Sequence, residues 1–145
     1  MFLVDTNILL YAVNPDSPDH VLAQSVLEEW RSGGSPWFLT WGIGYEFLRV
    51  STHRRVFPNP LTLSQARSWL DALLETPGLG VLVETDRHRG VLGELALAHP
   101  RVSGNLLHDL HTVALMKEHG VSEIRTADTD FHQFSSVKVV NPLIP

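Results

Sequence analysis

Short stretches typical of β-strands alternate with longer segments typical of helices, and this alternation constrains the fold of the chain more than any other feature. The strand-like stretches cover residues 2–4, 36–40, 81–83, 123–126 and 137–140. The helical segments, with the residues expected to start them, cover 8–13, 16–32, 42–52, 63–75, 85–99 and 103–119. Elements in this order form right-handed crossovers around a mainly parallel sheet. We therefore expect an α/β fold: a three-layer α/β/α sandwich whose central sheet has about four to five strands.

The composition narrows the class of protein. The 145 residues include no cysteine and carry a formal net charge of −5. A chain of this length is expected to form one domain over residues 1–145, without disulfides or thiolate chemistry. No apolar run approaches the roughly 18 residues of a membrane span, so we expect a cytoplasmic protein with no membrane partner. The negative charge disfavours non-specific coating of nucleic acid, although it does not exclude an enzyme that acts on nucleic acid.

The first predicted strand ends in a carboxylate. Phe2, Leu3 and Val4 form a continuous apolar run, as in a strand buried on both faces, and Asp5 follows directly. In open parallel sheets the ligand site lies beyond the carboxyl ends of the strands. Asp5 is therefore predicted to face such a site from a central strand. The alternative is that Asp5 and Thr6 only cap the next helix.

Other acids occupy comparable positions. Glu46 lies early in the helix after the second strand, Asp109 lies early in a later helix, and Asp128 and Asp130 follow the fourth strand. Because such positions meet at one edge of a parallel sheet, we expect these acids to converge with Asp5.

Each of these acids also has an ordinary structural explanation. Glu46 can pair with Arg49, one helical turn later. Asp109 can be an exposed helix acid, and Asp128 and Asp130 can simply form a turn. A shared role is favoured because the predicted fold brings all of them to the same edge.

Clustered carboxylates point to a metal ion. They repel one another and take up protons unless a cation lies among them. Oxygen ligands without cysteine suit Mg²⁺ or Mn²⁺ rather than zinc. Such an ion lowers the pKa of an attacking water and binds a phosphate oxygen, so the implied chemistry is hydrolysis of a phosphodiester. One or two ions are compatible with the pattern.

The order and spacing of these motifs resemble the PIN-domain family. The matching segments are Val4-Asp5-Thr6-Asn7, Glu46, Asp109 and Thr126-Ala127-Asp128-Thr129-Asp130-Phe131. The length is similar to that of the VapC type, the toxin half of a toxin–antitoxin pair. The resemblance covers essentially the whole chain and implies a ribonuclease that depends on Mg²⁺ or Mn²⁺.

The resemblance also implies roles for individual residues and partners for the chain. The implied catalytic, metal-binding quartet is Asp5, Glu46, Asp109 and Asp128, and Asp130 is an auxiliary metal-binding acid. The implied supporting residues are Thr6, Asn7 and Thr126. The substrates are expected to be structured RNAs, transfer RNA or ribosomal RNA. The expected protein partners are a second copy of the chain, giving a homodimer, and a VapB-type antitoxin.

Basic residues offer contacts for RNA. Arg49, Arg54 and Arg55 lie in the densest basic cluster, at the start of a proline-containing loop. Positive side chains beside an acidic centre can bind the phosphates of RNA. The alternative is a solvated surface and, for Arg49, a pair with Glu46.

Other interpretations of the same residues stay open. His108 and His111 flank Asp109, where many members of the resembled family carry other residues. His108 can tune the site or contact RNA; the alternatives for such a histidine are a solvated side chain, which is the more common case, and a metal ligand. A Mg²⁺-dependent phosphatase or phosphotransferase with Asp5 as nucleophile is a second possibility, although Asn7 stands where that chemistry usually needs another acid. A third is a catalytically silent module that only binds RNA or protein.

Overall fold

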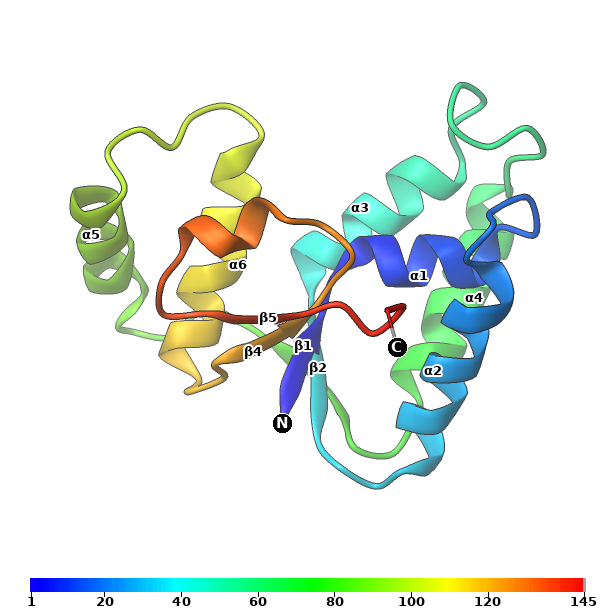
Figure 1. Ribbon diagram of the computed structural model, residues 1–145, viewed down its shortest axis with the longest axis horizontal. Helices are drawn as coiled ribbons and strands as arrows, with labels where there is room; N and C mark the ends of the chain where they lie inside the picture. Colours follow the sequence, from blue (N-terminus) through cyan, green and yellow to red (C-terminus); the bar gives the residue numbers. More distant parts are fainter. Residues whose placement is uncertain (145) are drawn as a thin grey trace.

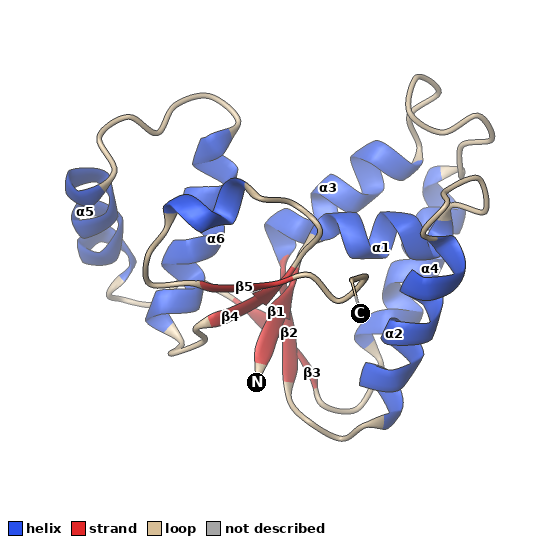
Figure 2. Cartoon of the chain, in the orientation of Figure 1, coloured by secondary structure: helices blue, strands red, loops and turns tan. Residues whose placement is uncertain are grey.

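A parallel sheet forms the centre of the computed structural model, which describes residues 1–144. Its five strands have the order β3-β2-β1-β4-β5, and every neighbouring pair is parallel. The strands are β1 (Phe2–Val4), β2 (Trp37–Thr40), β3 (Leu79–Leu82), β4 (Glu123–Arg125) and β5 (Lys138–Val140). β1 is the central strand, as predicted (Figure 2).

Helices cover both faces of the sheet, with α1 to α4 on one side and α5 and α6 on the other (Figure 1). Their bounds are α1 (Thr6–Val13), α2 (His20–Ser32), α3 (Trp41–Ser51), α4 (Leu63–Leu74), α5 (His88–Ala98) and α6 (Leu106–Glu118). This arrangement confirms the predicted α/β/α sandwich. Within residues 1–144, no helix is both long and apolar enough to cross a membrane.

β1 is buried because a helical layer lies against each of its faces. Leu3 and Val4 are fully buried, which accounts for the continuous apolar run in the sequence. β1 pairs with β2 through Phe2 and Trp37, and with β4 through Val4 and Arg125. As a result, the residue that follows β1 lies beside the residue that follows β4.

Two helices begin at the carboxyl edge of the sheet with no intervening loop. Asp5 Oδ1 accepts a hydrogen bond of 2.7 Å from the Thr6 N–H at the start of α1. Thr40, the last residue of β2, caps α3 by accepting a hydrogen bond of 3.1 Å from the Ile43 N–H. These side-chain caps satisfy amide donors that the first turn of a helix leaves without a partner. They also hold the first turns of α1 and α3 at the edge where ligands bind in such sheets.

Several predicted boundaries were wrong by one to four residues, and two of these differences have a clear physical reason. β3 begins earlier than expected because Leu79 already pairs with Trp37 of β2. The helix predicted to be capped by Thr85 begins only at His88, and no side chain caps it. The Thr85 hydroxyl donates a hydrogen bond of 2.7 Å to Glu118, a residue distant in sequence, and accepts one of 3.2 Å from the Arg87 N–H just before the helix. Local pattern alone does not reveal such a long-range contact.

Candidate active site

Asp5 occupies the carboxyl end of the central strand. Its N–H donates a hydrogen bond of 3.0 Å to the Arg125 carbonyl, which continues the ladder between β1 and β4 by one step. One carboxylate oxygen, Oδ1, accepts from Thr6 N, and the other, Oδ2, accepts from the Thr126 hydroxyl at 2.8 Å. The alternative role foreseen for Asp5, capping of α1, is therefore real, but it uses one of the two oxygens.

Asn7 and Thr126 form a polar clamp around Asp5. The Asn7 side-chain amide donates to the Thr126 hydroxyl at 3.0 Å and to Asp5 Oδ2 at 3.3 Å. Its Oδ1 accepts a hydrogen bond of 3.2 Å from the Ala127 N–H. Thr126 is completely buried, and its hydroxyl also accepts from the Asp128 N–H at 3.0 Å. The clamp thus fixes the segment after β4 against the end of β1.

Asp128 and Asp130 extend from this segment into solvent, and both are exposed. Asp128 Oδ1 accepts a hydrogen bond of 3.0 Å from the Asp130 N–H, so the turn-forming role is also present. A short 3₁₀-helix that the sequence did not predict, η1 (Asp130–Gln133), begins here. Its Phe131 is buried and anchors the turn to the core.

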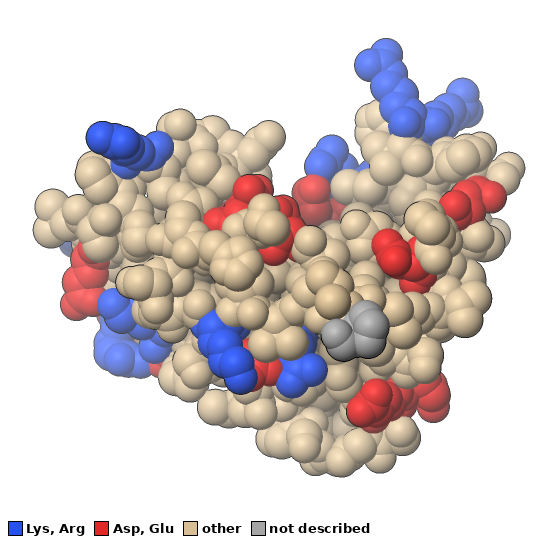
Figure 3. Space-filling view, viewed as in Figure 1, with Lys and Arg blue, Asp and Glu red and all other residues tan. Residues whose placement is uncertain are grey.

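The charges of the acids act on one another. Asp109 is half-buried in the first turn of α6, and burial raises its pKa to about 7, with further contributions from the charges of Asp5, Asp130 and Asp128. Burial also raises the pKa of Asp5, and the charges of Asp128 and Glu46 act in the same direction, against its hydrogen bonds. In Figure 3, acidic side chains lie on both sides of a groove between the α6–η1 part and the α3 part of the molecule.

Glu46 faces this groove from α3 and pairs with Arg49. The guanidinium approaches the carboxylate with two nitrogens, at 2.7 Å from Nη2 to Oε1 and 3.1 Å from Nε to Oε2. The local pairing that was foreseen as an alternative is therefore present, yet the charge of Glu46 still acts on Asp5. Arg49 is engaged by Glu46, whereas Arg54 and Arg55 are exposed on the loop between α3 and α4.

The acidic cluster has the chemistry of a site for a hard divalent cation. Its donors are all carboxylates; burial raises the pKa of Asp5 and Asp109, and the negative charges of the neighbouring acids add to that effect. A separate group of possible metal ligands lies elsewhere in residues 1–144. It consists of Glu84, His88 and His111, whose ligand atoms lie within 4.8 Å of one another, and it includes none of these acids.

Sequence reasoning did not single out Glu84 and Glu118. Glu118 is buried near the end of α6 and accepts hydrogen bonds from Thr85 and His88. Its position one helical turn after the buried Ala114 and Leu115 was the available signal, since an acid on an apolar face needs partners. Glu84 is an exposed residue after β3 and carried no comparable signal.

A parallel sheet with carboxylates converging beyond its central strand defines the class of this protein: an α/β protein with an acidic site at the carboxyl edge. The sequence model of the PIN domain family matches residues 2–137. Ribonuclease VapC37 of Mycobacterium tuberculosis is 34% identical, over 98% of this chain and 97% of that protein. Ribonuclease VapC48 of the same species is 30% identical, over 95% of this chain and 94% of that protein. The chain belongs to the PIN domain family and, within it, to the VapC ribonucleases. Metal dependence is typical of this family.

Solved structures have the same fold. VapBC2 from Rickettsia felis, bound to a DNA fragment from its promoter, matches with a TM-score of 0.68 and 18% identity over 97% of both chains. VapC20 of Mycobacterium tuberculosis, a toxin that cleaves the sarcin-ricin loop, matches with a TM-score of 0.64 and 16% identity over 93% of this chain and 95% of that one. At these identities the likeness concerns the fold alone.

Proposed function

We propose that this chain, as a single domain, is the toxin of a VapBC-type toxin–antitoxin pair and cleaves structured RNA, a transfer RNA or a ribosomal RNA, in the presence of Mg²⁺ or Mn²⁺. The observation that carries the proposal is the convergence of Asp5, Asp109 and Asp128 beyond the central strand, with Glu46 across the groove. Mutual repulsion in this cluster favours a cation. The names of its relatives supply the substrate class.

The residues have separate tasks in this proposal. Asp5, Glu46, Asp109 and Asp128 hold the ion, in part through water, and Asp130 assists them. When bound, such an ion lowers the pKa of the attacking water and neutralises charge on the phosphate.

The rest of the site positions these acids. Thr126 and Asn7 fix the orientation of Asp5 through the hydrogen bonds to its Oδ2. Arg49 fixes the direction of the Glu46 carboxylate and reduces the net negative charge on the α3 side of the groove. Asp109 has to lose its proton before it can bind the ion, because a protonated carboxyl is a poor ligand.

The proposed RNA path passes the loop between α3 and α4. Arg54 and Arg55 are exposed there, and the basic side chains over this loop rise above the acidic groove in Figure 3. Phosphates flanking the cleaved bond would meet positive charge on the loop and the metal ion in the groove. This separation of charge allows a chain with a net charge of −5 to bind RNA locally.

The proposed protein partners are a VapB-type antitoxin and a second copy of the chain. The fold neighbours include VapBC-1 from nontypeable Haemophilus influenzae and the VapBC2 complex mentioned above. An acidic groove attracts a basic side chain, so a segment of an antitoxin carrying Arg or Lys is expected to compete with the metal ion and the RNA.

The phosphatase alternative requires Asp5 to attack phosphorus directly. Both of its oxygens already accept hydrogen bonds, and the side chain is largely enclosed by the Thr126 clamp, which disfavours a nucleophilic role. A binding module without activity stays as the other alternative. A trapped phosphorylated Asp5 would support the phosphatase, and RNA binding without cleavage would support the module.

The test is cleavage of total transfer RNA and ribosomal RNA by the antitoxin-free protein with Mg²⁺, Mn²⁺ or EDTA. We expect discrete fragments with either metal ion and none with EDTA. Asp5→Asn should abolish cleavage and leave the far-UV circular dichroism unchanged. Asp71→Asn, the same change at an exposed acid on α4, is the matched control and should cleave normally. Cleavage by Asp5→Asn at the wild-type rate would show that the site is assigned wrongly.

A further inference from the structure

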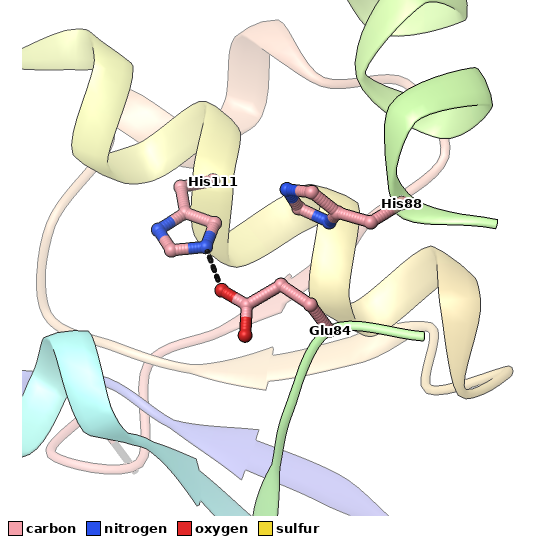
Figure 4. Close-up of side chains that lie close together, drawn as sticks. All are labelled: Glu84, His88 and His111. Carbon is pink, nitrogen blue, oxygen red and sulfur yellow. Dashed lines mark hydrogen bonds and ion pairs between the residues drawn. The ribbon is translucent and has the colours of Figure 1, made fainter. Parts of the chain in front are cut away.

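A second cluster of possible metal ligands lies beside α6. Glu84 follows β3, His88 is the first residue of α5, and His111 lies within α6. One ligand atom from each residue lies within 4.8 Å of the other two. Figure 4 shows the imidazole of His88 directed toward His111, whose Nε2 lies 2.7 Å from Glu84 Oε1. The cluster therefore joins three segments that are separate in the sequence.

The cluster lies on a different face of α6 from the acidic site. Asp109 and His111 are two positions apart on the same helix. Their side chains are therefore separated by about 200° around the helix axis and leave it on nearly opposite sides. Asp109 faces the acids of the groove, whereas His111 faces the connection between β3 and α5. An ion held by His111 is therefore distinct from one held by Asp109.

A buried carboxylate sets the orientation of His88. The His88 Nδ1 lies 2.7 Å from Glu118 Oε2, and the Glu118 side chain has 0% exposure. Glu118 Oε1 in turn accepts hydrogen bonds from the N–H and the hydroxyl of Thr85, at 2.9 and 2.7 Å. A carboxylate beside Nδ1 favours the tautomer that has its proton there, and this tautomer leaves Nε2 available to a metal ion. Histidines that bind metal ions characteristically donate their other N–H to a carboxylate in this way.

We propose that Glu84, His88 and His111 form a binding site for a divalent transition-metal ion, with Zn²⁺ as its natural occupant. Two imidazoles and one carboxylate are a common ligand set for zinc with one open position, and imidazole donors select against Mg²⁺. Tetrahedral zinc requires ligand atoms about 3.3 Å apart. The hydrogen bond between His111 Nε2 and Glu84 Oε1, 2.7 Å long, lies where the proposed ion would bind.

Small side-chain movements are enough to complete the site. The Glu84 and His111 side chains are 50% and 45% exposed, so both can rotate without disturbing the core. The His88 side chain is 25% exposed and already held by Glu118. The bound ion connects the segment after β3 and the start of α5 to α6. Because the unfolded chain has no such preformed site, Zn²⁺ stabilises the folded state.

The test is calorimetric titration of the whole protein with ZnCl₂ in excess MgCl₂, which keeps the acidic groove occupied by Mg²⁺. The melting temperature is measured alongside. We expect one Zn²⁺ per chain and a rise in melting temperature that Mg²⁺ alone does not produce. His111→Ala should weaken Zn²⁺ binding by more than the roughly 10–100-fold that loss of an outer partner costs. Glu84→Gln should weaken it too, and both variants change exposed side chains.

His108→Ala is the matched control, because it removes another exposed histidine of α6 and keeps the three ligands. It should bind Zn²⁺ as the wild type does. Absence of stoichiometric Zn²⁺ binding by the wild type would overturn the proposal, as would equal binding by His111→Ala. Loss of binding in Asp5→Asn, with His111→Ala unaffected, would overturn it by locating the ion in the acidic groove.

Discussion

The hydroxyl of Thr126 donates a hydrogen bond of 2.8 Å to Asp5 Oδ2, although the two residues are 121 positions apart in the sequence. Parallel pairing of β1 with β4 brings them together, since Val4 lies opposite Arg125. The same hydroxyl accepts from Asn7 and from the N–H of Asp128. Thr126 thus links the two strand ends that carry the proposed metal ligands.

Replacement of Thr126 by Val is expected to impair both stability and activity. Val has a similar shape but no hydroxyl, so Asp5 loses a donor and the amides of Asn7 and Asp128 lose an acceptor inside a buried site. We expect the free energy of unfolding to fall by about 1–3 kcal/mol, the cost of leaving buried polar groups without partners. Urea unfolding measures this loss, and RNA cleavage should slow because Asp5 is no longer oriented. Thr126→Ser keeps the hydroxyl and should retain most of the stability; an equal loss in both variants would contradict the role of this hydrogen bond.

The stability of the metal-free protein should fall as the pH rises from about 4 to about 7 through the ionisation of Asp109. The pKa of this carboxyl is raised from its ordinary value of 3.8 to about 7 in the folded protein. Over this interval the folded state keeps a proton that the unfolded chain has released, so each increase in pH favours unfolding. Asp109→Asn should remove most of this decline, which urea unfolding in EDTA at several pH values would reveal.

The control for this pH dependence is Asp71→Asn, at an exposed acid on α4. It should show the same decline as the wild type. Saturating Mg²⁺ should reverse the decline in the wild type, because the ion replaces the proton on the clustered carboxylates. A wild-type stability that stays flat over the interval in EDTA would be incompatible with the burial and repulsion described for Asp109.

Removal of the basic side chains of the α3–α4 loop should weaken RNA binding. We expect the double variant Arg54→Ala, Arg55→Ala to bind substrate RNA less tightly and with a weaker dependence on salt. The slope of log K against log salt should shrink by about 0.7 for each phosphate of single-stranded RNA that the variant no longer neutralises. Arg67→Ala, which removes an exposed arginine of α4, should leave the slope unchanged. Filter binding at several salt concentrations, with Asp5→Asn as background to prevent cleavage, provides the measurement.

Substitution of Glu118 by Gln should destabilise the connection between α5 and α6. Hydrogen bonds from His88 and Thr85 outweigh the desolvation of this buried carboxyl and lower its pKa. Its contribution to stability is therefore present above the ordinary value of 4.5 and is lost as the pH falls through the lower folded pKa. At neutral pH we expect Glu118→Gln to cost about 1.5–3 kcal/mol, as for hydrogen bonds to a charged group.

Thermal unfolding at neutral pH and near pH 3 would test this effect, because the difference between Glu118→Gln and the wild type should shrink at the acid end. Glu94→Gln is the matched control. Glu94 belongs to an exposed pair with Lys117 that also joins α5 to α6, at 3.3 Å. Exposed pairs contribute little, so this variant should unfold near the wild-type temperature. Equal effects of the two substitutions on the unfolding temperature would show that the buried hydrogen bonds of Glu118 stabilise the protein no more than the exposed pair does.

The sequence alone determined the elements of the fold and the position of the first acid. The alternation of strands and helices and the apolar run Phe2–Val4 are signals carried by neighbouring residues. They depend on backbone geometry that repeats within a few residues, so they could be recognised without the tertiary structure. The same local reasoning anticipated the capping role of Asp5 and the pairing of Glu46 with Arg49.

The tertiary structure decided which distant residues meet. The strand order places Thr126 beside Asp5, and the packing of α6 on the segment after β3 brings Thr85 and His88 to Glu118. The local context of Thr85 predicted a helix cap but not its hydrogen bond to Glu118, which this packing allows. These interactions join residues far apart in the chain, and their energies depend on burial and on the exact set of partners. Neither quantity is encoded in the spacing of residues along a single segment, because both arise only when the layers pack together.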